Sequence, residues 1–125
     1  MNINDLSGEI IDSAIKVHSI LGPGLLESAY EACLAHELEL RGFQVKQQVK
    51  QPLIYEGISL DIGYRLDLLI EGKVIIELKV QDKILPIHEA QLLSYLKLSN
   101  IKLGLILNFK VLRLRDGIKR IANNI

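Results

Sequence analysis

The sequence YRLDLLIEGKVIIELK, from Tyr64 to Lys79, decides the fold. Apolar and polar side chains alternate along both of its halves, and Glu71-Gly72 marks a tight turn between them. Alternation with a period of two is typical of strands, so the stretch predicts a β-hairpin. Its strands nevertheless carry Asp67, Glu77 and Lys79 at their centres.

The length of the turn determines which side chains share a face, because opposed residues of an antiparallel pair point the same way. A two-residue loop, Glu71-Gly72, would send Asp67 and Glu77 to opposite faces. A three-residue loop, Ile70 to Gly72, pairs Leu69 with Lys73 and produces one clean apolar face. That apolar face would contain Tyr64, Leu66, Leu68, Val74, Ile76, Leu78 and Val80. The opposite face would contain Arg65, Asp67, Lys73, Glu77 and Lys79.

Three helices are predicted around this hairpin. Apolar residues recur at three- and four-residue spacing from Leu6 to Leu21, and this helix ends at the GPG sequence, residues 22–24. A second helix follows, with Leu26, Ala29, Cys33 and Leu34 on its apolar stripe, and ends near Gly42. Pro86 opens the third helix, because proline is well tolerated at the first helical position.

The other elements are short β-rich segments. Between residues 43 and 80 they are FQVKQQV, LIYEGISL, YRLDLLI and KVIIELKV, and KLGLILNF follows the third helix. The third helix can act as a crossover that lays this last strand parallel to the hairpin. We therefore predict one α/β (α+β) domain over residues 1–125, with a mixed central sheet flanked by helices. The basic tail after residue 109 fits either a strand or a loop.

Composition and charge narrow the protein class. The 15 basic and 15 acidic residues balance, and no apolar run is long enough to cross a bilayer. The first 17 residues lack the basic start and continuous apolar stretch of a signal peptide. Cys33 is the one cysteine and is expected to be a buried, reduced thiol. We expect a cytoplasmic protein without a membrane partner.

Two carboxylates and a lysine on one sheet face predict a cation site. Asp and Glu oxygens suit Mg²⁺, which usually takes only one or two protein carboxylates and keeps several waters. Such an ion can activate water beside a phosphodiester, and a nearby ammonium can orient that water. The alternative is a surface ion-pair network, which is common on exposed strands and contributes little stability.

Residues on the second and third helices add to this set. Glu27 and Tyr30 follow the GPG turn, at a helix N-terminus where the helix dipole favours a carboxylate. Gln91 and Tyr95 are four residues apart and share one face of the third helix, with His88 one turn earlier. Tyr30, His88 and Tyr95 are possible supporting residues; each tyrosine could equally cover the site or only bury its ring.

These motifs together resemble a known family. The stretch GPGLLESAY, residues 22–30, resembles the signature of the GxxExxY protein family, with Gly24, Glu27 and Tyr30 at its named positions. The later stretches YRLDLLIEGKVIIELK, HEAQLLSYLK and LGLILNF look like that family's remaining blocks in the same order. The family looks like a compact branch of the PD-(D/E)xK nuclease superfamily, whose core is a helix, a three-stranded meander, a helix and a fourth strand.

The resemblance implies a nuclease site that uses Mg²⁺ or Mn²⁺. Its metal ligands would be the side chains of Glu27, Asp67 and Glu77 and the backbone carbonyl of Leu78. Lys79 would position or activate the attacking water, and Gln91 would orient Lys79 or a phosphate. Gln91 and Tyr95 also match the QxxxY pattern of RecB-type exonuclease domains.

The resulting hypothesis is a metal-dependent nuclease with DNA as its expected substrate. One alternative is a nucleic-acid or protein binding module that keeps the nuclease fold without turnover. Another is a subunit that is active only in a homo-oligomer or with a partner protein. A basic cluster near the C-terminus is expected to contact nucleic-acid phosphates, unless it is an ordinary solvated face. Its members are Arg113, Arg115, Lys119 and Arg120.

Overall fold

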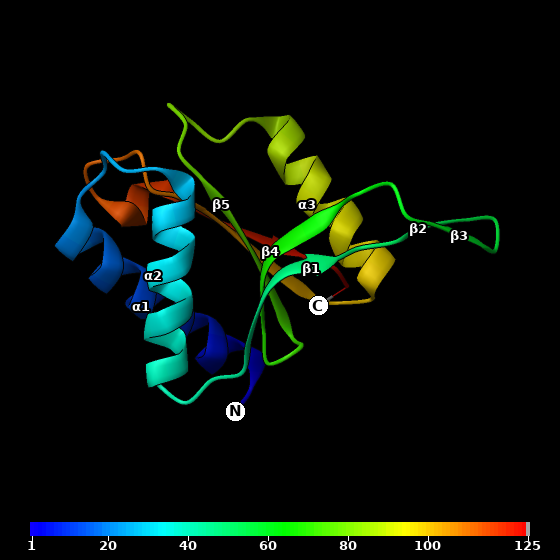
Figure 1. The fold of residues 1–125 in the computed structure, drawn as a ribbon, viewed down its shortest axis with the longest axis horizontal. Coiled ribbons are helices and arrows are strands. Elements are labelled where there is room, and N and C mark those ends of the chain that lie inside the picture. The colour runs from blue at the N-terminus through cyan, green and yellow to red at the C-terminus, as the bar shows by residue number, and fades with distance from the viewer. Residues whose placement is uncertain (125) are drawn as a thin grey trace.

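The computed structural model describes residues 1–124 and consists of helices on both faces of a mixed sheet (Figure 1). The helices are α1 (Ile3–Leu21), α2 (Glu27–Leu40) and α3 (Pro86–Ser99). Within the described residues, none of them is long and apolar enough to cross a membrane. All three lie where the sequence predicts them. The final residue of the predicted domain, Ile125, lies outside the described part of the chain.

The central sheet has five strands in the order β1-β4-β5-β6-β7. These strands are β1 (Val45–Lys50), β4 (Arg65–Ile70), β5 (Val74–Lys79), β6 (Leu103–Asn108) and β7 (Ile118–Ala122). Among the strands of the described residues, only β5 and β6 pair in parallel, because α3 connects them as a crossover. The tail left open by the sequence forms a 3-10 turn, η1 (Leu114–Gly117), and the antiparallel edge strand β7.

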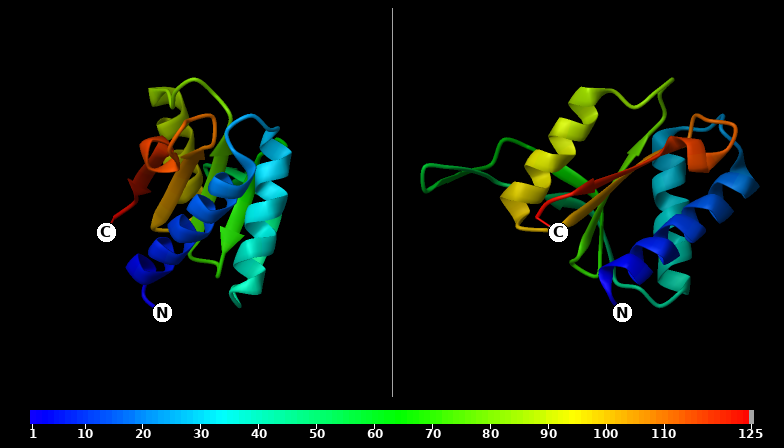
Figure 2. Two further views of the ribbon diagram at one scale, coloured as in Figure 1. Left: turned by 90° about the vertical axis from the view of Figure 1, so that its left-hand side faces the viewer. Right: turned by 180° about the vertical axis from the view of Figure 1, so that it is seen from behind.

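Each face of the sheet is covered by helices, as the two views of Figure 2 show. α1 and α2 pack on one face, where the larger core includes Leu68, Ile70, Val74 and Ile76. On the other face α3 contributes to a second core, whose buried residues are Leu66, Ile75, Leu92, Tyr95, Leu96 and Ile106. The second face is therefore partly apolar, and not only charged as expected.

The β4–β5 hairpin has a three-residue loop, but the predicted register was wrong by two residues. The loop is Glu71–Lys73, so Ile70 pairs with Val74 instead of Leu69 with Lys73. A shift of two preserves the face of every side chain, so Asp67 and Glu77 still share a face. The cause is Glu71, which adopts a left-handed conformation (φ 54°) before Gly72 (φ 64°).

Backbone pairing between β4 and β5 extends from Ile70–Val74 to Leu68–Ile76. At the start of β4 the predicted apolar face does not continue. Tyr64 is 38% exposed, and Leu66 packs in the α3-side core rather than with Leu68. The predicted face therefore holds only where the two strands are paired.

The segment LIYEGISL does not join the central sheet. It forms a separate two-stranded sheet of β2 (Leu53–Tyr55) and β3 (Ile58–Leu60), which projects from the body of the molecule between β1 and β4 (Figure 1). Glu56 and Gly57 form its turn with left-handed φ values of 47° and 80°. Glu-Gly forms a turn here, as it does at residues 71–72. The turn divides the predicted β-rich segment into two strands of three residues each.

The buried stripe of α2 lies one residue further along than predicted. Its buried residues are Tyr30, Leu34, Ala35 and Leu38. Cys33 is exposed and free, and Leu26 is 76% exposed, so both expectations for these residues were wrong. The reason is Tyr30, whose ring stacks on Phe109 with a centroid distance of 4.4 Å and so turns that side of α2 toward the sheet.

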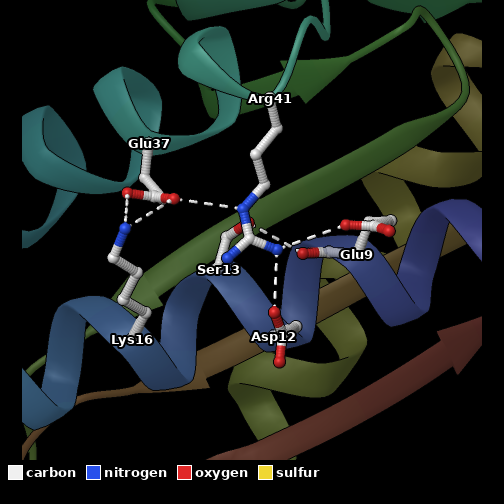
Figure 3. Close-up of polar contacts among 6 residues, drawn as sticks. All are labelled: Glu9, Asp12, Ser13, Lys16, Glu37 and Arg41. Atoms are coloured by element: carbon white, nitrogen blue, oxygen red, sulfur yellow. Dashed lines mark hydrogen bonds and ion pairs between the residues drawn. The ribbon is translucent and has the colours of Figure 1, made fainter.

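An ionic network joins α2 to α1 (Figure 3). Arg41 follows α2, and its guanidinium contacts Asp12 at 2.8 Å, Glu37 at 3.1 Å and Glu9 at 3.2 Å. Lys16 contacts the other side of the Glu37 carboxylate at 3.0 Å. The charges of α1 and of the end of α2 are thus matched across the helix pair, which links the C-terminal end of α2 to α1.

The other end of α2 is fixed by the GPG turn. The Tyr30 hydroxyl donates a hydrogen bond to the carbonyl of Gly22 and accepts one from the amide of Leu25 at 3.1 Å. Both bonds hold the turn that precedes Glu27, the first residue of α2. Tyr30 is fully buried, so these bonds are shielded from water.

We predict that Tyr30→Phe lowers the free energy of unfolding by about 1 to 3 kcal/mol, because the Gly22 carbonyl and Leu25 amide lose their buried partner. The ring and its stacking on Phe109 remain. Urea denaturation would measure the change. Tyr55→Phe is the matched control, since the Tyr55 side chain is 63% exposed and should leave stability unchanged. Equal effects of the two substitutions would contradict the assigned role of the Tyr30 hydroxyl.

Candidate active site

The centre of the candidate site is the point where β4 and β5 stop pairing. Beyond the Leu68–Ile76 pair the opposed residues are Asp67 and Glu77. Here the Leu78 amide donates to Asp67 Oδ2 at 2.9 Å, and the Asp67 amide approaches Glu77 Oε1 at 3.4 Å. Carboxylate oxygens thus replace backbone carbonyls as acceptors, which holds both carboxyl groups at the opening between the strands.

Glu77 is 7% exposed. Burial raises the pKa of Glu77 to about 9, and the neighbouring Asp67 charge and a hydrogen bond with its side chain add to the shift. The Asp67 amide and the Lys79 ammonium act in the opposite direction. Two carboxyl groups this close cannot both ionise without cost, so the pair retains a proton or requires a cation.

Glu27 extends the acidic site from the N-terminus of α2. Partial burial of its carboxyl raises its pKa, and the charge of Asp67 raises it further. The Lys79 charge lowers the pKa of Glu27 as well as that of Glu77. These four residues, Glu27 on α2, Asp67 on β4 and Glu77 and Lys79 on β5, therefore act on one another electrostatically.

Two further residues contact this site and were missed by sequence reasoning. Gln48 on β1 donates to Glu31 Oε1 at 2.7 Å and approaches Asp67 Oδ1 at 3.4 Å. Gln48 has a left-handed φ of 50°, so the edge strand bends where it passes Asp67. Glu31 could have been found, because it is four residues after Glu27 on the same helix face. Gln48 could not, since its position depends on the β1–β4 register.

The opposite border of the site is aromatic. Tyr95 on α3 is 6% exposed, and its ring lies 5.8 Å from that of Tyr64. Burial raises the pKa of Tyr95, and the charge of Glu77 contributes next. Gln91 is exposed one turn earlier on α3. The structure thus places Tyr95 beside the carboxyl pair and Gln91 on the adjoining part of the helix.

A family model described as the PD-(D/E)XK nuclease superfamily matches residues 4–121. The chain belongs to this superfamily. No curated protein and no solved structure matches the chain significantly. The predicted fold is confirmed, because a five-stranded mixed sheet flanked by three helices is consistent with that of PD-(D/E)XK nucleases.

Two possible supporting residues of this PD-(D/E)XK chain have other contacts. Tyr30 holds the GPG turn through its hydroxyl. The Nδ1 atom of His88 accepts a hydrogen bond from the Leu85 amide at 3.0 Å, which caps the N-terminus of α3. These hydrogen bonds give Tyr30 and His88 structural roles that require no part in a reaction. A supporting role of either residue in the site stays a prediction.

The basic cluster near the C-terminus is divided between surfaces. Arg120 donates to Asn4 at 2.9 Å on α1, whereas Lys119 lies 3.7 Å from Glu89 on α3. Arg113 and Arg115 flank the buried Leu114 of η1 and are exposed. Neighbouring residues of a strand point to opposite faces, so the side chains of Lys119 and Arg120 leave β7 on opposite sides of the sheet.

The carboxylates of the site supply oxygen donors of the kind that bind hard cations. Within residues 1–124, no group of three or more His, Cys, Asp or Glu side chains is close enough to hold a metal ion. The predicted set of three carboxylates is therefore not assembled as drawn. Asp67 and Glu77 nevertheless supply two adjacent oxygen donors, which suits an ion that takes only one or two carboxylates. The donor set fits Mg²⁺ or Mn²⁺.

We predict that stability without metal falls as pH rises from about 4.5 to about 9. Glu77 has the higher pKa when folded, so its contribution is full below the unfolded value of 4.5 and is lost up to about 9. The slope for this group is at most about 1.4 kcal/mol per pH unit. Asp67→Asn removes the neighbouring charge and should flatten the slope.

Chemical denaturation at several pH values in chelator would measure this dependence. Asp116→Asn is the matched control, because Asp116 is exposed on η1, away from β4 and β5. Asp116→Asn should leave the difference in the free energy of unfolding between pH 5 and pH 8 unchanged. If Asp67→Asn has no greater effect than Asp116→Asn, the two carboxyl groups of the site are not coupled as the structure indicates.

Proposed function

We propose that this protein is a metal-dependent nuclease that hydrolyses phosphodiester bonds, with DNA as its expected substrate. The observation that carries the proposal is the Asp67–Glu77 pair where β4 and β5 part, in which Glu77 is buried, Asp67 is half-buried and the pKa of Glu77 is raised to about 9. Placing such an acidic pair in the fold costs stability, and perturbed acidic groups of this kind are typical of catalytic sites. Membership of the PD-(D/E)XK superfamily supports the same function.

The residues of this chain would have distinct roles in the reaction. Asp67 and Glu77 would hold Mg²⁺ or Mn²⁺, with the Leu78 carbonyl and Glu27 as further ligands. When bound, the ion would supply Lewis acidity and would lower the pKa of water, so that the nucleophilic hydroxide forms near neutral pH. Lys79 would orient that water and offset the charge that develops on the phosphate. Gln91 would position Lys79 or a phosphate oxygen.

We further infer that the chain belongs to the GxxExxY branch of the superfamily. Gly24, Glu27 and Tyr30 occupy the named positions of its signature. Two of these residues are linked in the fold, since the Tyr30 hydroxyl holds the turn that directly precedes Glu27. The Gln91 and Tyr95 pair similarly supports a RecB-type arrangement, because Tyr95 borders the carboxyl pair.

One observation favours the alternative of a binding module that keeps the nuclease fold. The described residues contain no ready group of three metal-binding side chains. A chain that lost turnover would keep its fold and could still bind nucleic acid or a protein. Metal binding distinguishes the two functions, because only the nuclease requires it.

We predict that Mg²⁺ or Mn²⁺ raises the melting temperature and supports cleavage of nucleic acid by the parent protein. Asp67→Asn should reduce the rate by at least about 100-fold, a loss typical of one positioned catalytic group. It should also abolish the metal-induced rise in melting temperature. Single- and double-stranded DNA and RNA would be tested in parallel with thermal melts.

Two matched controls isolate the site. Asp116→Asn makes the same chemical change on η1, and Lys83→Met can be compared with Lys79→Met, since Lys83 is exposed beyond the end of β5. Both controls should retain activity. A parent protein that is indifferent to metal and inactive on all four substrates would exclude the nuclease and favour the binding module.

We predict that nucleic-acid binding by the parent weakens with salt. Each phosphate contact contributes about 0.7 to 0.9 to the slope of log K against log salt concentration. Glutamine at Arg113, Arg115, Lys119 and Arg120 should reduce the slope, most through the two arginines beside Leu114, because Arg120 and Lys119 already have partners. Glutamine at Lys73 and Lys102 is the control. An equal change per substituted charge would show that the cluster is only a solvated face.

A further inference from the structure

The β2–β3 hairpin has one apolar face. In its register Leu53 pairs with Leu60 and Tyr55 with Ile58. Paired residues share a face, and so do residues two apart on one strand, so all four of these side chains lie on the same side. The paired Ile54 and Ser59 point to the opposite side. The hairpin is therefore a small amphipathic sheet.

This apolar face has no cover within residues 1–124. Tyr55 is 63% exposed, Ile58 59% and Leu60 42%, and the hairpin projects away from both cores (Figure 1). Ile62 and Tyr64, on the return to β4, extend the apolar surface. A lone two-stranded hairpin is marginally stable in water, and a contiguous exposed apolar patch of this kind marks an interaction surface.

The charges around the hairpin argue against nucleic acid as its partner. Residues 51–64 contain no Lys, Arg or His, whereas Glu56 lies at the turn and Asp61 after β3. The basic residues at the base of the hairpin, Lys50 and Arg65, lie 2.6 Å and 3.9 Å from Asp61. A phosphate backbone would thus meet an acidic tip and partly neutralised cations.

We propose that the apolar face of the β2–β3 hairpin is the interface of a two-fold symmetric dimer of this chain. Two hairpins packed face to face and antiparallel would bury both apolar faces against each other. The acidic tip of one, Glu56, would then lie over the base of the other, where the two cations Lys50 and Arg65 share the single carboxylate of Asp61 and so leave an excess of positive charge. The surface is self-complementary in polarity and in charge, as a two-fold interface requires.

The dimer would also constrain the candidate site. The hairpin returns to β4 through Tyr64, whose ring lies 5.8 Å from Tyr95, and β4 carries Asp67. Covering the hairpin would therefore hold the start of β4 in place. The proposal does not depend on nuclease activity, because self-association is measured without substrate or metal.

Sedimentation velocity over a range of concentrations tests the interface on the full chain. We expect the parent to form a dimer, and Ile58→Lys to raise its dissociation constant at least about tenfold, because an unpaired ammonium is costly to bury. The matched control is Ser59→Lys, one residue away on the opposite face, which should leave the dimer intact. Circular dichroism of each variant would verify the fold.

Further variants make the result decisive. Tyr55→Lys tests the same face from β2 and should also give monomers. Glu56→Lys should weaken the dimer by roughly twofold to fivefold per contact, as expected for an exposed ion pair. A parent protein that stays monomeric at all concentrations overturns the proposal. This holds also if Tyr55→Lys changes the binding of single-stranded DNA or of another protein by that monomer. Equal loss with Ile58→Lys and Ser59→Lys also overturns it, and an unchanged Glu56→Lys dimer overturns the antiparallel arrangement.

Discussion

The pairing of β4 with β5 is the constraint on which both the core and the candidate site depend. Their side chains alternate between two helix layers, so a slip of one residue between the strands would send Asp67 and Glu77 to opposite faces of the sheet. The observed register keeps the two carboxyl groups together, with Val74 and Ile76 in the core beneath α1 and α2 and Ile75 beneath α3. The face that carries Glu77 therefore combines the candidate site with a second apolar core.

The sequence predicted which side chains share a face where β4 and β5 are paired, but neither the register nor the change of face at Leu66. The shared face follows from local alternation, which is visible from Leu68 to Leu78. The register depends on Glu71, which adopts a left-handed conformation and exchanges two hydrogen bonds with Gln44: its amide donates to the Gln44 carbonyl at 2.9 Å, and its carboxylate accepts from the Gln44 amide at 2.6 Å. This contact with the residue before β1 is tertiary, so no local pattern could reveal it.

Other departures from the sequence-based expectations have the same origin. The stripe of α2 follows Tyr30 because its ring stacks on Phe109, a partner 79 positions further along the chain. Gln48 joins the site because β1 bends beside Asp67. The helices, the crossover and the common face of Asp67 and Glu77 could be predicted because spacing expresses them locally, whereas the roles of Glu27, Asp67, Glu77 and Lys79 stay predictions. Contacts between distant segments set the remaining details.

The site lies where β4 and β5 give up their backbone pairing. Where Asp67 and Glu77 stand opposed, carboxylate oxygens accept the bonds of the Leu78 and Asp67 amides, so the strands part while these donors remain satisfied. The pair of the buried Glu77 and the half-buried Asp67 opposes folding unless a proton or a cation neutralises it. The cores on both faces of the sheet offset that cost, and the Arg41 network and the Tyr30 hydroxyl anchor the two ends of α2. Because α2 is held at both ends, its first residue, Glu27, starts from an anchored helix terminus, and its carboxyl group is coupled electrostatically to Asp67 and Lys79.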